Sequence, residues 1–184
     1  PSLVGLFTLA PEIIEVVGGP EYLPATLSLR ILTVALAFSL LGGWIGNIIF
    51  LPSGREKICL YVCVLSALIN FVANIFLIPK WGINAAAFTT ALSQFIAFAV
   101  SVPFIEKEVD IGNIFKLTSA PVVGGIFVGL VVTMVKAFIA NLWIKTLTAI
   151  LLSVIVYVLV MVVMKNEFVV NILNSVLNKI GIKG

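Results

Sequence analysis

The sequence predicts an all-α protein, a polytopic transmembrane bundle of about six helical spans followed by a C-terminal amphipathic helix. Hydrophobic residues make up 61% of the 184 positions and charged residues only 10%, whereas soluble domains carry about 25% charged residues. The mean hydropathy is +1.25. The apolar stretches reach roughly 20 residues, the length that crosses a hydrocarbon layer of about 30 Å. Strands of a membrane barrel would instead be about ten residues long and of alternating polarity.

Polar turns divide the chain into six apolar segments. The first segment is the least hydrophobic and ends at the turn Gly18-Gly19-Pro20. The sixth consists almost entirely of Leu, Val and Ile, which suits a helix surrounded by lipid. The expected spans are about 3–17, 29–51, 58–78, 83–105, 115–139 and 146–164.

A short amphipathic helix is expected after the sixth span. Its apolar residues recur at helical spacing, opposite asparagines and a lysine, so we expect it to lie flat on the membrane surface. These apolar residues are Phe168, Val169, Ile172, Leu173, Val176, Leu177 and Ile180.

The basic residues of the connections predict the orientation, because cytoplasmic loops accumulate Lys and Arg. One set of connections is richer in basic residues than the other, so we expect it, with the C-terminus, to be cytoplasmic in a cell membrane. The richer set holds Arg55, Lys57, Lys107, Lys116, Lys165, Lys179 and Lys183, and the other holds Arg30, Lys80 and Lys145.

Several classes of function are disfavoured. The net charge is +3 without a run of basic residues, so no nucleic-acid partner is expected. Histidine is absent, and Cys59 and Cys63 lack the spacing of metal ligands, so we expect no catalytic site, metal or cofactor. The chain begins at Pro1 inside a hydrophobic stretch without a basic leader, and we expect it to be part of a longer protein.

Small and polar residues form stripes on the second, third and fourth spans. One interpretation is helix packing, in which each interhelical contact contributes about 1 kcal/mol. The other is a hydrophilic cavity in which Asn47, Asn70, Asn74 and Gln94 offer hydrogen bonds to a sugar-containing substrate. The stripes are Ser39, Gly43 and Asn47 with Gly42 and Gly46; Cys59, Cys63, Ser66, Asn70 and Asn74; and Ala86, Thr90, Ser93, Ala97 and Ser101 with Gln94.

Charged residues inside or near the spans have two interpretations each. Glu12 and Glu15 either lie at the interface or take part in proton or cation coupling. Arg30 either anchors its helix or attracts a pyrophosphate. Lys136 either snorkels to the outer interface or pairs with an anionic group of a lipid or an intramembrane partner. It shares a face with residues that predict close packing, namely Gly125, Gly129 and Thr133.

Several segments within residues 3–105 resemble a known family. The most specific is the turn Pro79-Lys80-Trp81-Gly82 followed by a helix of small residues. The others are Leu9-Ala10-Pro11-Glu12-Ile13-Ile14, Gly18-Gly19-Pro20-Glu21-Tyr22, Leu29-Arg30-Ile31-Leu32, Leu51-Pro52-Ser53-Gly54-Arg55-Glu56-Lys57, Ala67-Leu68-Ile69-Asn70 and Asn74-Ile75-Phe76-Leu77-Ile78. Together they resemble the bacterial and archaeal polysaccharide flippases of the multidrug/oligosaccharidyl-lipid/polysaccharide exporter superfamily. One departure is Asn84, where the family commonly has glycine.

The resemblance implies a domain organisation. Residues 1–105 would be four helices of the C-terminal lobe, 106–164 two additional peripheral helices, and 165–184 a cytoplasmic interfacial tail. The six spans look like the last six of a fourteen-helix transporter, so an N-terminal lobe of the same chain would be a partner.

The resemblance also implies a function. The transporter would move lipid-linked oligosaccharide, usually on polyprenyl pyrophosphate, from the inner to the outer leaflet by alternating access, for capsule, exopolysaccharide or lipopolysaccharide assembly. Its other partners would be membrane lipids. The alternatives are a peptidoglycan lipid-precursor flippase or a multidrug exporter of the same superfamily and, in another class, a membrane-embedded glycosyltransferase or polymerase or a purely structural membrane subunit.

Overall fold

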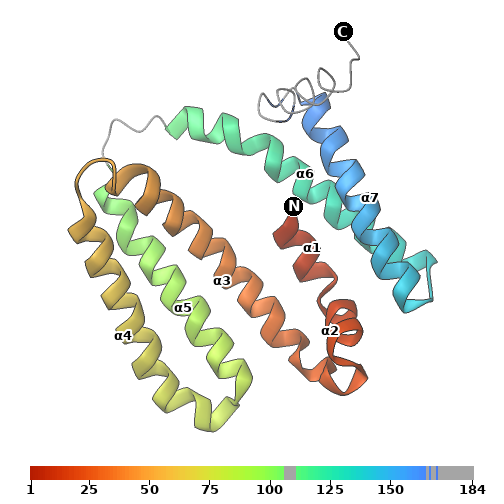
Figure 1. The fold of residues 1–184 in the computed structure, drawn as a ribbon, viewed down its shortest axis with the longest axis horizontal. Coiled ribbons are helices and arrows are strands. Elements are labelled where there is room, and N and C mark those ends of the chain that lie inside the picture. Colours follow the sequence, from red (N-terminus) through yellow and green to blue (C-terminus); the bar gives the residue numbers. More distant parts are fainter. Residues whose placement is uncertain (106–110, 165, 167–168, 170–184) are drawn as a thin grey trace. The chain divides into compact units, whose positions relative to one another are not determined.

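The computed structural model describes residues 1–105, 111–164, 166 and 169 (Figure 1). Every regular element in this part of the chain is a helix. Five of these helical segments are long and apolar enough to cross a membrane. The predicted all-α membrane bundle is therefore confirmed, whereas the predicted C-terminal amphipathic helix lies almost entirely outside the described residues.

Seven α-helices follow one another in the described part of the chain. Three short helical turns accompany them: 3-10 helices at Pro20–Ala25 and Val102–Phe104, and a π-helix at Ile45–Phe50. The α-helices are α1 (Ser2–Thr8), α2 (Ala10–Gly18), α3 (Thr26–Trp44), α4 (Glu56–Trp81), α5 (Ile83–Ser101), α6 (Ile111–Phe138) and α7 (Leu142–Val163).

The first predicted span, residues 3–17, is divided into two short helices. The segment consists of α1 and α2, which meet at Leu9. Pro11 explains the break, because proline has no N–H to donate and its ring clashes with the carbonyl four residues earlier in a helix. Each helix has fewer than ten residues, about half the length needed to cross the hydrocarbon layer.

The connection between α4 and α5 consists of a single residue. The sequence predicts the end of the third span at Ile78, but α4 continues through Pro79 to Trp81. The N–H of Gly82 donates to the carbonyl of Ile78 at 2.8 Å, which closes the last turn. Gly82 has a φ of 56°, a left-handed conformation that glycine adopts without steric cost.

The helices form two compact units. One unit contains Ile13–Val109, and the other combines Pro1–Glu12 with Asp110–Gly184. In the first unit α5 packs against both α3 and α4, and in the second α6 packs against α1 and α7 (Figure 1). The division implied by the family resemblance, at residues 105 and 164, remains a prediction.

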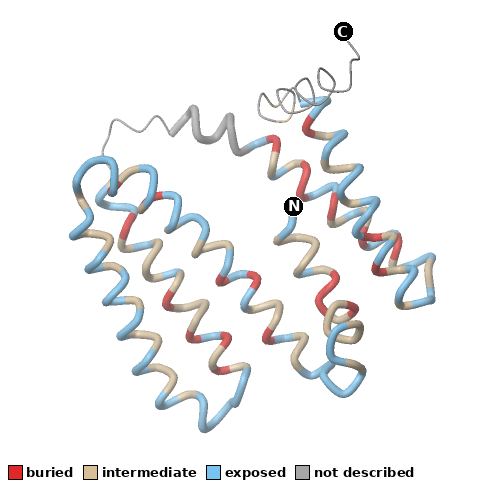
Figure 2. Tube along the Cα trace, in the orientation of Figure 1, coloured by how far each residue is buried: buried red, intermediate tan, exposed pale blue. Residues whose placement is uncertain are grey.

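Buried residues in the first unit concentrate on α5, while α4 has none (Figure 2). The buried positions of α5 are small: Ala85, Ala87, Thr89, Ser93 and Ser101. At one end of the helix, the buried hydroxyl of Ser28 on α3 donates to the Asn84 side chain at 2.7 Å. Small side chains therefore allow α5 to form the centre of a three-helix arrangement, as at many membrane helix interfaces.

Close packing of α6 against α7 depends on Gly124. A Cβ atom added there would lie 2.7 Å from a ring carbon of Tyr157, whereas one added at Gly125 would lie 3.4 Å from Val4. We expect Gly124→Ala to lower the free energy of unfolding by about 1–3 kcal/mol, because overpacking forces neighbours to shift. Thermal unfolding in detergent, with Gly125→Ala as the control, measures the difference. Equal melting temperatures for the two variants would contradict the observed packing.

Candidate substrate cavity

The second span ends in a widened helical turn that carries Asn47. The π-helix Ile45–Phe50 continues α3 directly, and the Leu51 N–H donates to the carbonyl of Gly46 at 3.0 Å, five residues earlier. Gly46 lies against α4, since a Cβ added to it would be 3.5 Å from the Cys59 sulfur. Short π-helical turns are frequent at functional sites.

A hydrogen-bond network joins α4 to α5. Asn70 Nδ2 donates to the hydroxyls of Thr90 and Ser93, each at 3.4 Å. Asn74 Nδ2 donates to Asn70 Oδ1 at 2.9 Å, and the buried Thr89 hydroxyl donates to Asn74 Oδ1. One turn earlier on α4, the Ser66 hydroxyl donates to the carbonyl of Ser93 at 3.2 Å. Asn70 and Asn74 thus join α4 to α5 through side-chain hydrogen bonds.

We expect Thr89→Val to destabilise the α4–α5 contact. Valine has nearly the same shape but cannot donate to Asn74, so the loss should be about 1 kcal/mol, the usual net value of a hydrogen bond. Thermal unfolding of the variant measures it. Thr33→Val is the control, since among the described residues the Thr33 hydroxyl bonds within its own helix, to the carbonyl of Leu29. A Thr89 variant as stable as the Thr33 variant would show that the network contributes nothing.

Most residues of the three polar stripes line one cavity of about 660 Å³. It is lined by α3 and the π-helix, by α4 and by α5. Its polar residues are Ser39, Asn47, Cys59, Cys63, Ser66, Asn70, Thr90, Ser93, Gln94 and Ser101, accompanied by Gly42, Gly43 and Gly46. Among the described residues, none that lines it carries a carboxylate, an ammonium or a guanidinium group. The cavity is therefore uncharged, and its lining mixes these polar groups with the apolar residues Phe50, Leu51, Val62, Ala67 and Ala97.

The structure separates the predicted cavity residues into two groups. Asn47, Asn70 and Gln94 line the cavity, whereas Asn74 and Arg30 do not. Within the described part of the chain, the side chains of Asn47 and Gln94 form no hydrogen bond. Each of these two amides thus has a donor and an acceptor group available to a ligand. Arg30 is half-buried on α3.

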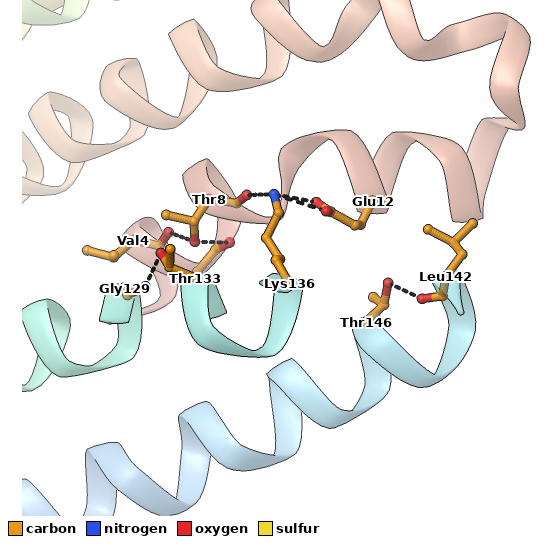
Figure 3. A network of polar contacts seen from close by, with 9 residues as sticks. Val4, Thr8, Glu12, Gly129, Thr133, Lys136, Leu142 and Thr146 are labelled. Carbon is orange, nitrogen blue, oxygen red and sulfur yellow. Dashed lines mark hydrogen bonds and ion pairs between the residues drawn. The ribbon is translucent and has the colours of Figure 1, made fainter. Parts of the chain in front are cut away.

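The second unit holds an ion pair that joins distant segments (Figure 3). Lys136, in the last turn of α6, lies with its Nζ 2.9 Å from Oε1 of Glu12. The carboxylate is buried, with 6% of the residue exposed. Of the two interpretations of Lys136, pairing with a partner inside the protein is therefore the one observed, and Glu12 is that partner. Glu15 is half-buried on α2.

The small residues of α6 allow α1 to lie close to it. A Cβ added to Gly129 would lie 3.2 Å from Val4 of α1, a tight contact, whereas one added to Gly125 would lie at an ordinary 3.4 Å, so glycine at position 129 leaves space for that helix. The Thr133 hydroxyl donates to the carbonyl of Gly129 at 2.8 Å and so is satisfied within its own helix. The predicted packing face thus contacts α1.

Sequence reasoning did not single out Thr89, Ser28 or the contact of Asn84. Thr89 is fully buried and satisfies Asn74. The signal for it was present, because Thr89 and Ser93 are four residues apart and lie on one face of a helix. Ser28 and Asn84 are separated by 56 residues, and no local pattern relates them.

One curated protein gives a significant match to the chain over most of its length. The Uncharacterized membrane protein MJ1068 of Methanocaldococcus jannaschii is 32% identical over 129 residues, which are 70% of this chain and 25% of that protein. The chain thus spans about a quarter of the length of this relative. No protein-family model and no solved structure matches the chain.

The chain is a membrane protein with several spans. Its five long apolar helical segments and its similarity to a membrane protein agree on this point. The exposed apolar side chains of α4, which include Leu60, Tyr61 and Phe71, are then explained as surfaces that face lipid or other transmembrane helices.

Proposed function

We propose that this chain forms part of a transporter that moves lipid-linked oligosaccharide from the inner to the outer leaflet of the cell membrane. The observation that carries the proposal is the uncharged cavity of about 660 Å³, in which amides, hydroxyls and glycines lie beside apolar side chains. Sugar hydroxyls both donate and accept hydrogen bonds, and amide side chains match them in both roles. The volume falls within the range of about 300–1,000 Å³ that is usual for small-ligand sites.

The resemblance of residues 3–105 to polysaccharide flippases supports the same substrate class. In this proposal the sugar headgroup enters the cavity while the lipid tail stays in the bilayer, and a second lobe completes the site. The C-terminus is cytoplasmic, and the protein serves cell-surface polysaccharide assembly. No covalent chemistry takes place, and the partners are the lipid-linked sugar, membrane lipids and the remaining lobe.

The lining residues also bear on the alternative functions. A cationic drug is best held by a carboxylate, and a glycosyltransferase or polymerase needs acidic or basic catalytic groups. The described lining of the cavity offers neither. The uncharged lining therefore favours a saccharide over a cationic drug, and transport over catalysis.

Reconstitution of the full-length protein tests the proposal. A fluorescent polyprenyl-pyrophosphate oligosaccharide is placed in proteoliposomes, and its appearance in the opposite leaflet is followed with a membrane-impermeant quencher or a lectin. We expect protein-dependent transfer of the oligosaccharide lipid. Transfer of a cationic dye without transfer of the sugar lipid would favour the drug-exporter alternative, and release of free or extended sugar chains would favour an enzyme.

A further inference from the structure

Three oxygen atoms surround the Lys136 ammonium group at nearly equal distances. The two carboxylate oxygens of Glu12 lie 2.9 and 3.0 Å from Nζ, and the carbonyl oxygen of Thr8 lies at 3.0 Å (Figure 3). Thr8 is the last residue of α1, and Glu12 lies in the first turn of α2. One ammonium group therefore contacts both sides of the helix break and joins them to α6.

The break itself produces this cluster of oxygens. In an uninterrupted helix the Thr8 carbonyl would accept a hydrogen bond from the backbone four residues later. Here it accepts from the Lys136 side chain. The Thr8 hydroxyl bonds back to the carbonyl of Val4 at 2.6 Å and does not compete for the same position. Discontinuous membrane helices commonly use such released carbonyls to coordinate monovalent cations.

We propose that the Glu12 carboxylate and the Thr8 carbonyl form a site for a monovalent cation. In the wild-type protein the ammonium group of Lys136, which is covalently part of the chain, occupies this site. The oxygens lie at the distance of an ammonium ion's hydrogen bonds. Calcium and magnesium bind oxygen at about 2.0–2.6 Å, so the site is too wide for them. Its single negative charge also matches one positive charge.

Two consequences follow from a cation that is attached to the protein. The wild-type site is already filled, so the stability of the protein does not depend on which monovalent salt is present. Removal of the lysine leaves a buried carboxylate beside a released carbonyl, and a free ammonium or potassium ion then binds in its place. Such binding stabilises the folded state in proportion to the logarithm of cation concentration.

Thermal unfolding of the full-length protein in nanodiscs tests this inference. Wild type and Lys136→Met are compared in ammonium, potassium and N-methylglucamine chloride at equal ionic strength. We expect the wild-type melting temperature to be the same in all three salts. That of Lys136→Met should be higher in ammonium and potassium than in N-methylglucamine by about 4 °C or more.

The double variant Glu12→Gln/Lys136→Met is the matched control, because it keeps the helix break and lacks the carboxylate. Its melting temperature should not depend on the cation. A single variant that is insensitive to the cation, or a double variant that is equally sensitive, would overturn the proposal.

Lys136→Arg serves as a second variant if Lys136→Met does not fold. The planar guanidinium cannot bring one nitrogen to all three oxygens, so the melting temperature should fall below that of wild type. A Lys136→Arg protein as stable as wild type would contradict an ammonium-sized site.

Discussion

Gly43→Trp is expected to slow transport by the full-length protein strongly while leaving the protein folded. A Cβ atom added at Gly43 has a single neighbour within 4 Å, the Asn47 amide nitrogen at 4.0 Å, so the new side chain extends into the cavity. An indole side chain covers about 200 Å² of surface and leaves little room for a sugar headgroup. We expect the transport rate to fall more than about tenfold, which corresponds to about 1.4 kcal/mol in the barrier.

Leu40→Trp is the control for Gly43→Trp. Leu40 lies on the same helix, 58% exposed and outside the cavity lining. Both variants are reconstituted in proteoliposomes, and transfer of the lipid-linked sugar is measured beside the melting temperature. Wild-type transport by Gly43→Trp would show that the substrate does not pass through this cavity. Equal loss in both variants would show that an aromatic side chain on α3 disturbs the protein in general.

Helical periodicity in the sequence identified most of the polar residues that line the cavity. Residues three or four positions apart share a helix face, so the stripes of Ser39 to Asn47, Cys59 to Asn74 and Thr90 to Ser101 could be assigned before any contact was known. The length of the apolar stretches identified the five long helical segments. Both properties depend on neighbours along the chain.

Other features depend on contacts between distant segments. Asn47 and Asn70 are both amides on polar stripes, yet only Asn70 meets hydroxyls of α5. The sequence could not separate amides without a partner from amides that join helices, because the difference lies in which side chains the adjacent helix presents. Lys136 and Glu12 are 124 residues apart, and their pairing requires the break before Pro11, which hydropathy does not detect.

Removal of the Glu12–Lys136 ion pair is the second change with a large expected effect, here on stability. In a buffer without small cations, we expect Lys136→Met to lower the free energy of unfolding by about 2–3 kcal/mol. Loss of one partner of a fully buried pair costs about 3–5 kcal/mol, because the other charge stays buried without compensation. The Lys136 side chain is 29% exposed, and water screens part of the interaction, which places the expected cost below that range.

A double-mutant cycle separates this pairing from the loss of packing. Glu12→Gln should cost less than Lys136→Met, because a neutral amide can still accept from the ammonium group, which is partly exposed. The double variant should be more stable than Lys136→Met, since no buried carboxylate remains. Reversible unfolding in mixed micelles provides the free energies of unfolding of wild type, the two single variants and the double variant. The effect of the double variant should differ from the sum of the two single effects by about 1 kcal/mol or more. Additive effects would mean that the two side chains lie close together without stabilising the fold. The apolar contacts of α1 with α6 would then hold α1 in place without help from the ion pair.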